Sequence, residues 1–244
     1  AVRLREAGYA HRILLLEGFF AASELETISD HRLATVVHSM EQVRLLRSTR
    51  LKQKLEVHLK VNTGMNRLGI ALSDVPRAIE LLQTAQIAQI ALMTHFACAE
   101  ERDGVHEQLQ RFEQVASTQP LPRNLANSAA LLRHPSTHAD WVRPGIMLYG
   151  ASPFDDQNAE ELGLRPAMTL TSEIIATQEL KAGDAVGYCA SFRATQPMRV
   201  GIIACGYADG YPRHASTGAP ALVAGVRTRL LGRVSMDMLC VDIT

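Results

Sequence analysis

Short apolar runs alternate with segments of helical periodicity over roughly the first 150 residues. The apolar runs predict strands at 13–16, 33–37, 55–61 and 88–94, with a further short strand ending at Leu125. The helical segments predict helices at 39–50, 74–86, 104–118 and 128–133, and a capping-box pattern at Ser23 predicts one more. The helix at 104–118 carries its apolar side chains on one face, namely Val105, Leu109, Phe112, Val115 and Ala116. Because the strands are continuous apolar runs, we expect a buried parallel sheet wrapped by helices.

The number of these units predicts the fold. About five or six β-then-α units fit in this region, which is most of a (β/α)8 TIM-type barrel whose first units lie outside the sequence. In such barrels the functional groups stand at the carboxyl ends of the strands. The residues that follow each predicted strand are therefore the first place to look for chemistry.

A different pattern begins after about residue 163. Helical periodicity is lost, and strand-like stretches appear at 167–176, 199–205, 221–224 and 228–232, separated by turn signals. We expect two domains, a partial barrel over 1–163 and a mostly β domain over 164–244, joined by the polar stretch 155–161. The segment 1–8 is typical of the last turns of a helix, and 240–244 has a strand-like alternation. These ends predict that both termini of the fold lie outside the sequence.

Composition limits the class of protein. Lysine plus arginine and aspartate plus glutamate both number 25, so no basic surplus favours nucleic acid as a partner. No apolar run reaches the roughly 20 residues that a membrane helix needs. The four cysteines show no disulfide or metal-ligand spacing, which is typical of reduced thiols in a cytoplasmic protein. The sequence contains only four lysines, which limits the candidates for any lysine-dependent chemistry: Lys52, Lys54, Lys60 and Lys181.

Residues that can bind an anion through a side chain or a backbone N–H stand at the ends of the predicted barrel strands. They are Lys60, Arg67, His95, Ser128, Arg143, Gly145 and Ile146. Arginine is a permanent cation with forked donors, and free N–H groups at a glycine or a helix start bind anionic oxygens. This set predicts a concave site for a phosphorylated, anionic, planar ligand. Taken alone, His95 is better explained as a core histidine, while Lys60 could be an ordinary cation and Arg143 a surface arginine.

Seven ordered motifs carry a family resemblance. They are LKVNTGMNRLG (59–69), THF (94–96), NSA (127–129), RPGIMLYG (143–150), VGYCASF (186–192), GYADGYPR (206–213) and GRVSMDM (232–238). Together they resemble the alanine racemases, in particular the enterobacterial type. Members of this family use pyridoxal 5'-phosphate to interconvert L- and D-alanine. The resemblance covers nearly the whole sequence.

The resemblance implies roles for the barrel residues. Arg143 is similar to the arginine that hydrogen-bonds the pyridine nitrogen of the cofactor, and Arg67 to the arginine at its phenolic oxygen and at the substrate. The phosphate cradle is expected from Ser128 and the N–H groups of Gly145 and Ile146. Lys60 resembles a lysine that is often carbamylated and then positions Arg67.

The resemblance also implies roles in the second domain. Tyr188 resembles one of two catalytic bases, which reaches into the active site of the partner subunit of a homodimer with shared active sites. A phenol has a pKa of about 10, so such a base needs support from its neighbours, and His95 held by Arg143 resembles that support. Met236, beside Asp237, resembles the residue whose backbone binds the substrate carboxylate. Tyr207 resembles a gating tyrosine, although a purely structural aromatic fits equally well.

One departure separates the sequence from the family pattern. In the family one lysine carries the cofactor and serves as the other base, and none of the four lysines of this sequence matches it. The tyrosine that helps to hold the cofactor phosphate near the C-terminus of family members has no match in this sequence either. We therefore expect this chain by itself to be inactive, as a fragment of a working racemase that supplies D-alanine for cell-wall peptidoglycan or degrades alanine.

Three other functions remain open beside the racemase. A broad-specificity amino-acid racemase fits the same scaffold. A non-catalytic pyridoxal-phosphate carrier with a single barrel is disfavoured by the second domain. A fold-related decarboxylase is disfavoured because Arg143 takes the place of an acidic partner for the ring nitrogen.

Overall fold

The computed structural model describes all residues from Ala1 to Thr244. They form two compact units, Ala1–Met168 and Thr169–Thr244. This division falls a few residues after the boundary expected at 163. Each unit has its own core, and each is described by itself.

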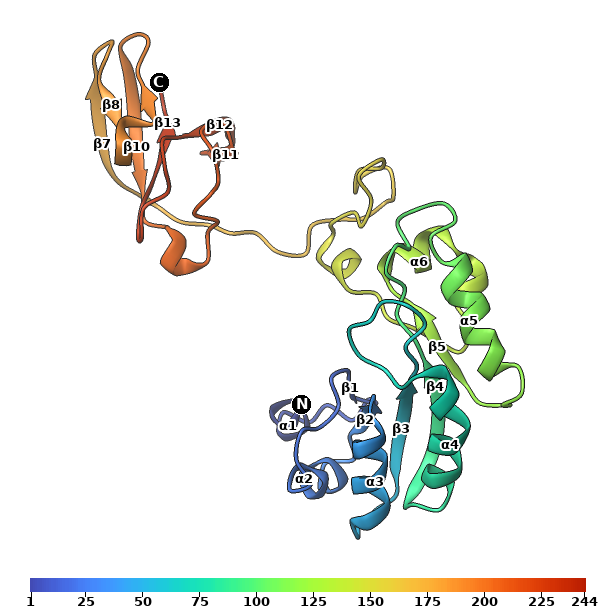
Figure 1. Ribbon diagram of the computed structural model, residues 1–244. Helices are drawn as coiled ribbons and strands as arrows, with labels where there is room; N and C mark the ends of the chain where they lie inside the picture. The colour runs from blue at the N-terminus through green and yellow to red at the C-terminus, as the bar shows by residue number, and fades with distance from the viewer. The chain divides into compact units, whose positions relative to one another are not determined.

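A six-stranded parallel sheet is the centre of the first unit, with strands in the order of the sequence. The sheet curls as part of a barrel does, which confirms the expected fold class (Figure 1). Its strands are β1 (Leu14–Leu15), β2 (Ala34–Val37), β3 (Leu55–Lys60), β4 (Ile87–Met93), β5 (Arg123–Ala126) and β6 (Trp141–Val142). All four residues of β2 are buried, as are all but one of β3, so the prediction of strands without alternation is confirmed.

Helices connect these strands and cover the sheet (Figure 1). They are α1 (Val2–Glu6), α2 (Glu24–Asp30), α3 (Met40–Ser48), α4 (Val75–Gln83), α5 (His106–Ala116) and α6 (Ser128–Arg133). Short 3-10 helices add η1 (Leu72–Asp74), η2 (Pro135–Thr137) and η3 (Ile146–Tyr149). Leu46, Leu82 and Phe112 reach one continuous core with the strands, and each is fully buried. This core fixes where the strand ends lie.

The predicted capping box at Ser23 is wrong. The Ser23 side chain makes no capping hydrogen bond, and its backbone is already helical. Instead the carboxylate of Glu24 accepts hydrogen bonds from the N–H groups of Phe20, at 2.6 Å, and Ala21, at 3.2 Å. The segment before α2 therefore folds back onto the carboxylate of Glu24, which accepts hydrogen bonds from backbone N–H groups that lie outside the helix.

The second unit is an antiparallel sheet in the order β11-β12-β13-β10-β7, with a separate pair β8-β9. Its strands are β7 (Ile174–Leu180), β8 (Ala185–Val186), β9 (Phe192–Arg193), β10 (Met198–Ile203), β11 (Pro220–Val223), β12 (Val226–Leu231) and β13 (Leu239–Asp242); η4 (Tyr188–Ala190) and η5 (Tyr207–Asp209) are 3-10 helices. The predicted strand at 167–176 is largely wrong, because only 174–180 pairs with β10. No helix is both long and apolar enough to cross a membrane.

Candidate active site

The carboxyl ends of four neighbouring strands meet at one cavity of about 610 Å³. Among the residues that line it are all seven proposed from the barrel motifs: Lys60, Arg67, His95, Ser128, Arg143, Gly145 and Ile146. They come from segments spread over more than eighty residues and meet because parallel strands in sequence order bring their carboxyl ends to the same edge. The cavity is rich in cations and hydrogen-bond donors, so it suits an anionic ligand.

The guanidinium of Arg143 is the most firmly held group of this site. Its Nη2 donates to the carbonyl oxygens of Thr94, at 2.8 Å, and Leu125, at 3.1 Å, while Nη1 donates to Oδ1 of Asn124. Burial lowers the pKa of Arg143 to about 10. That value still leaves the group charged at neutral pH. Arg143 is therefore a fixed cation whose donor geometry is set by the strand ends.

His95 is held neutral beside this cation. Its Nδ1 lies 3.3 Å from Nη2 of Arg143. Burial, followed by the charges of Arg143, Arg67 and Lys60, lowers the pKa of His95 to about 4. Arginine can only donate, so Nδ1 is the acceptor and the ring proton sits on Nε2. The imidazole can thus donate from Nε2 to a further group.

Arg67 stands in a tightly folded loop between β3 and η1. Oδ1 of Asn62 accepts from the N–H groups of Gly64, at 3.1 Å, and Asn66, at 3.2 Å, which forms an Asx-type turn. Gly69 closes the loop at φ +133°, where an added Cβ would come within 2.6 Å of the backbone nitrogen of Asn62. The loop conformation therefore depends on residues that the sequence motif contains.

Lys60 is buried at the end of β3, with 7% of its surface exposed. Burial lowers the pKa of its ammonium, and the positive charges of Arg67 and Arg143 lower it further, against a smaller opposing effect of Glu17. A buried lysine with a lowered pKa releases its proton more readily than a surface lysine. Its amine is thus better suited to react with an electrophile.

A candidate anion cradle lies where α6 and η3 begin. Asn127 caps α6 by accepting from the N–H of Ala130 at 3.0 Å, and the N–H of Gly145 donates to Oγ of Ser128 at 2.7 Å. The Ser128 hydroxyl therefore keeps its own proton for another acceptor. A Cβ added to Gly145 would stand 3.8 Å from that Oγ and would fill the space in front of it. The glycine leaves room for an anionic group beside a hydroxyl donor.

The candidates of the second unit occupy a different surface. Tyr188 and Tyr207 line a cavity of about 800 Å³, together with Arg213, His214 and Arg233. Tyr188 is 68% exposed and stands between residues with unusual backbone conformations, Gly187 at φ +69° and Cys189 at φ +60°. This exposed position leaves the phenol available to a partner.

Met236 is not among the residues that line this second cavity. Its carbonyl accepts from the N–H of Ala208 at 2.9 Å, and Gly206 is required there because an added Cβ would meet that carbonyl oxygen at 2.2 Å. Its own N–H donates to no group in the chain. A free backbone donor next to the turn that carries Tyr207 is suited to hold a small acid.

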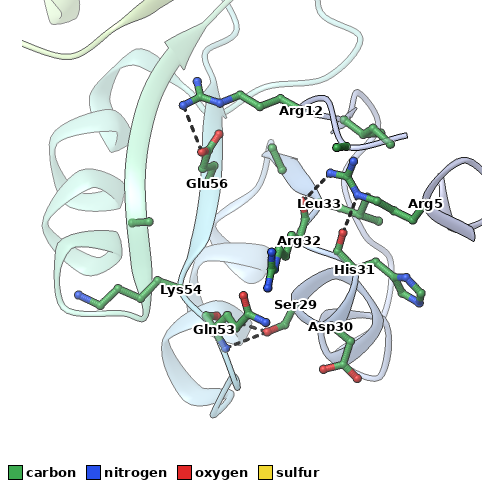
Figure 2. Close-up of a pocket in the computed structure, with 14 residues that line it drawn as sticks. Arg5, Arg12, Ser29, Asp30, His31, Arg32, Leu33, Gln53, Lys54 and Glu56 are labelled. Atoms are coloured by element: carbon green, nitrogen blue, oxygen red, sulfur yellow. Dashed lines mark hydrogen bonds and ion pairs between the residues drawn. The ribbon is translucent and has the colours of Figure 1, made fainter. Parts of the chain in front are cut away.

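A further cavity, of about 550 Å³, opens at the amino ends of the strands (Figure 2). Two of its basic residues already have partners. Arg5 donates to four backbone carbonyls, at His31, Arg32, Tyr9 and His11. Arg12 pairs with Glu56 at 3.6 Å. These two cations hold the chain together, so they are not free to bind a ligand in this cavity.

Sequence reasoning missed the polar side chains that lie beneath the site. His58 and Asn124 are 3% and 1% exposed, and both stand on barrel strands. Gln108 on α5 is also buried. The signal that could have found them is a polar residue at a position where the apolar pattern predicts burial.

Comparisons with known proteins agree across both units. The family model "Alanine racemase, N-terminal domain" matches residues 1–153, and "Alanine racemase, C-terminal domain" matches residues 167–244. The chain is 58% identical to an alanine racemase of Nitrosospira multiformis and 56% identical to one of Nitrosomonas eutropha. Each match covers the whole chain and 70% or 69% of the relative. A relative from Klebsiella aerogenes, named "Alanine racemase, catabolic", is 52% identical over 100% of the chain and 69% of its own length.

Solved structures give the same family. The biosynthetic alanine racemase of Pseudomonas aeruginosa matches with a TM-score of 0.93 and 44% identity, over 99% of this chain and 68% of that one. The alanine racemase of Acinetobacter baumannii matches with a TM-score of 0.90 and 37% identity, over 100% and 69%.

Proposed function

The chain belongs to the alanine racemase family, and we propose that its strand-end cavity holds pyridoxal 5'-phosphate while the protein interconverts L- and D-alanine. The family depends on this cofactor. The observation that carries the proposal is the cavity itself, in which Arg143, Arg67, Ser128 and neutral His95 meet. None of the alternatives, a broad-specificity racemase, a carrier protein or a decarboxylase, has support from the comparisons.

The residues present fit the cofactor. Ser128, Ile146 and the space left by Gly145 would hold its phosphate, since they provide a hydroxyl donor and room at a helix start. Arg67 would face the phenolic oxygen, and Arg143 the ring nitrogen. When bound, pyridoxal 5'-phosphate acts as an electron sink that makes the Cα–H bond of alanine acidic.

Arg143 keeps its own proton at neutral pH, because its pKa stays at about 10. It would therefore donate a hydrogen bond to the ring nitrogen without transferring a proton. By leaving that nitrogen unprotonated, Arg143 would weaken the electron withdrawal that the cofactor supplies and would favour return of the proton over side reactions. Arg143 would in this way favour racemisation.

Tyr188 is the proposed base for L-alanine, supplied by a second copy of the chain in a homodimer with shared active sites. Its Oη would take the proton from Cα of L-alanine and return it in the reverse direction. The proton on Nε2 of His95 would stabilise the phenolate, because His95 is held in the Nε2–H form by Arg143. The proton transfer on the opposite face of Cα belongs to the lysine that the family resemblance implies.

Substrate contacts complete the proposal. The unpaired N–H of Met236, next to Asp237, would also come from the second copy of the chain and would hold the carboxylate of alanine together with Arg67 of the first copy. Tyr207 would limit the space for the substrate side chain. We also infer a cytoplasmic enzyme that supplies D-alanine for peptidoglycan or degrades alanine, and the relatives include both a biosynthetic and a catabolic enzyme.

Replacement of Tyr188 by phenylalanine tests this assignment in the holoenzyme. Because the two enantiomers have equal energy, kcat/KM must fall equally in both directions, and we expect a loss of about 100-fold or more. In deuterated water the Cα hydrogen of D-alanine should still exchange, whereas that of L-alanine should not. The matched control is Tyr9→Phe, an exposed tyrosine of the first unit. Unchanged exchange of L-alanine in Tyr188→Phe would refute the base assignment.

A further inference from the structure

A buried chain of polar side chains joins α5 to the ends of β3 and β4. We propose that Gln108, Thr63 and Thr94 form a positioning network that fixes His95 and Arg143 relative to each other. The proposal rests on the proposed function, because it names residues that act through the groups of that site. None of the three side chains lines the strand-end cavity.

Gln108 connects two loops of the site by itself. It stands on α5 with 8% of its surface exposed. Its Oε1 accepts from the N–H of Ala97 at 2.7 Å, and its Nε2 donates to the carbonyl of His95 and to Oγ1 of Thr63, both at 3.0 Å. The two contacts to 95 and 97 enclose the backbone on either side of a fully buried phenylalanine. The side-chain amide of Gln108 therefore fixes the position of the His95 backbone just after the end of β4.

The orientation of every group in the network is determined. Oγ1 of Thr94 donates its only proton to the carbonyl of Val61 at 3.1 Å. The 2.7 Å contact between Oγ1 of Thr63 and Oγ1 of Thr94 must then be donated by Thr63. Thr63 in turn accepts from Gln108. The bonds run in one direction, from Gln108 through Thr63 and Thr94 to Val61, with each hydroxyl used once as donor and once as acceptor.

Both ends of this network reach the proposed catalytic groups. The carbonyl of Thr94 is the acceptor at 2.8 Å for Nη2 of Arg143, the same nitrogen that faces His95. Thr63 begins the loop that carries Arg67, and its carbonyl accepts from Arg111 of α5 at 3.3 Å. A shift of α5 would thus move the acceptor of Arg143, the backbone of His95 and the start of the Arg67 loop together.

The network differs from ordinary core packing. Thr63 and Thr94 are each 1% exposed, and a valine of the same shape would fill either place without polar atoms. Polar groups that are buried in one hydrogen-bonded chain specify a single arrangement, whereas apolar groups of the same volume tolerate small displacements. Small displacements matter here, because a misplacement of about 1 Å can cost on the order of 100-fold in rate.

The test uses two matched pairs in the holoenzyme. Gln108→Met removes all three amide contacts, and Gln110→Met makes the same change at an exposed position of the same helix. Thr63→Val removes the hydroxyl while keeping the shape, and Thr63→Ser keeps the hydroxyl. We expect kcat for alanine to fall by about 10-fold or more in Gln108→Met and Thr63→Val. It should stay within about twofold in Gln110→Met and Thr63→Ser, with KM changed less than kcat.

A second readout is independent of turnover. The ring nitrogens of His95 are followed by ¹⁵N NMR, and in Thr63→Val and Gln108→Met we expect the Nδ1 signal to shift as its contact with Arg143 loosens. Thr63→Ser and Gln110→Met should leave that signal in place. If Gln108→Met fails to fold, Thr63→Val still tests the network, and if Thr63→Val fails to fold, Gln108→Met does.

The outcomes separate the network from the proposed function. Folded Thr63→Val with wild-type kcat and an unmoved His95 signal would overturn the network, whatever the enzyme does. A wild-type protein that does not racemise alanine would overturn the proposed function instead, and the His95 signal would then judge the network alone.

Discussion

Nδ2 of Asn124 lies 3.0 Å from Nδ1 of His58, and Oδ1 of the same amide accepts a hydrogen bond from Arg143. Because arginine can only donate, it fixes the amide so that Nδ2 donates to His58. The ring proton of His58 is therefore on Nε2, and this ring and that of Trp141 form a T-shaped pair with centroids 5.3 Å apart. Burial, with the charges of Arg143 and Arg12, lowers the pKa of His58 to about 4. Neutral His58 thus fixes the amide of Asn124, and this amide in turn holds the guanidinium of Arg143.

The first prediction concerns the pH dependence of stability. His58 and His95 both have a folded pKa of about 4, below the ordinary value of 6.5, so the unfolded chain binds their protons first. The stability that they contribute is complete above pH 6.5 and is lost as the pH falls towards 4. Within that window each histidine adds a slope of about 1.4 kcal/mol per pH unit to the free energy of unfolding. His58→Gln should remove one such slope in urea titrations between pH 4.5 and 6.5.

An exposed histidine of α5 serves as the control for this prediction. His106→Gln should leave the slope as it is in the wild type, because His106 lies on the surface. An equal slope in wild type, His58→Gln and His106→Gln would contradict the neutral, buried state of His58.

The strands and the site in the barrel could be predicted from the sequence for one physical reason. Parallel strands that are buried on both sides need continuous apolar runs, and their carboxyl ends meet at one edge. Strand positions alone therefore predict that Lys60, His95 and Arg143 lie together, and in the structure all three line one cavity. The detailed role of each of these residues is still a prediction.

What could not be predicted depends on partners that are distant in the sequence. The stretch 167–173 alternates as a strand does, yet strand pairing with β10 begins only at Ile174. His58 and Asn124 are polar residues within apolar strands. Their role is visible only in the folded structure, where Asn124 bonds to both His58 and Arg143. Tertiary hydrogen bonds, rather than local propensity, decide these positions.

The second prediction concerns the room in front of Ser128. Gly145→Ala should still fold, because the new Cβ would have only an ordinary contact with Oγ of Ser128, although ψ −94° lies outside the regions that alanine prefers. The methyl group would occupy the space proposed for the cofactor phosphate, so we expect the Kd for pyridoxal 5'-phosphate to rise by about 10-fold or more. Fluorescence titration measures the Kd, and the free energy of unfolding in urea should fall by no more than about 3 kcal/mol, the cost of the backbone strain. An unchanged Kd would mean that the phosphate binds elsewhere.

The third prediction concerns Lys60. Its lowered pKa leaves more of the neutral amine, which is the form that adds CO₂, whereas the pKa of Lys52 is raised by its hydrogen bonds to Asp30 and Glu26. We expect a carbamate signal in ¹³C NMR of the protein in labelled bicarbonate, absent in Lys60→Arg and kept in Lys52→Arg. A signal that survives in Lys60→Arg, or no signal in the wild type, would show that Lys60 remains an ordinary cation.

The last prediction separates a steric clash from backbone strain in the Arg67 loop. Gly69→Ala places a Cβ within 2.6 Å of the nitrogen of Asn62 and 2.8 Å of the carbonyl carbon of Val61, at φ +133°. Gly163→Ala, in the same unit, also requires positive φ, +67°, but its Cβ would meet nothing within 4 Å. We expect Gly69→Ala to lose about 3 kcal/mol or more of unfolding free energy and Gly163→Ala about 1 kcal/mol. Trp141 is the only tryptophan of the chain and lies in this unit, so its fluorescence follows the relevant unfolding. Equal losses in the two variants would show that the loop can move away from the clash, and that the position of Arg67 is set by something other than Gly69.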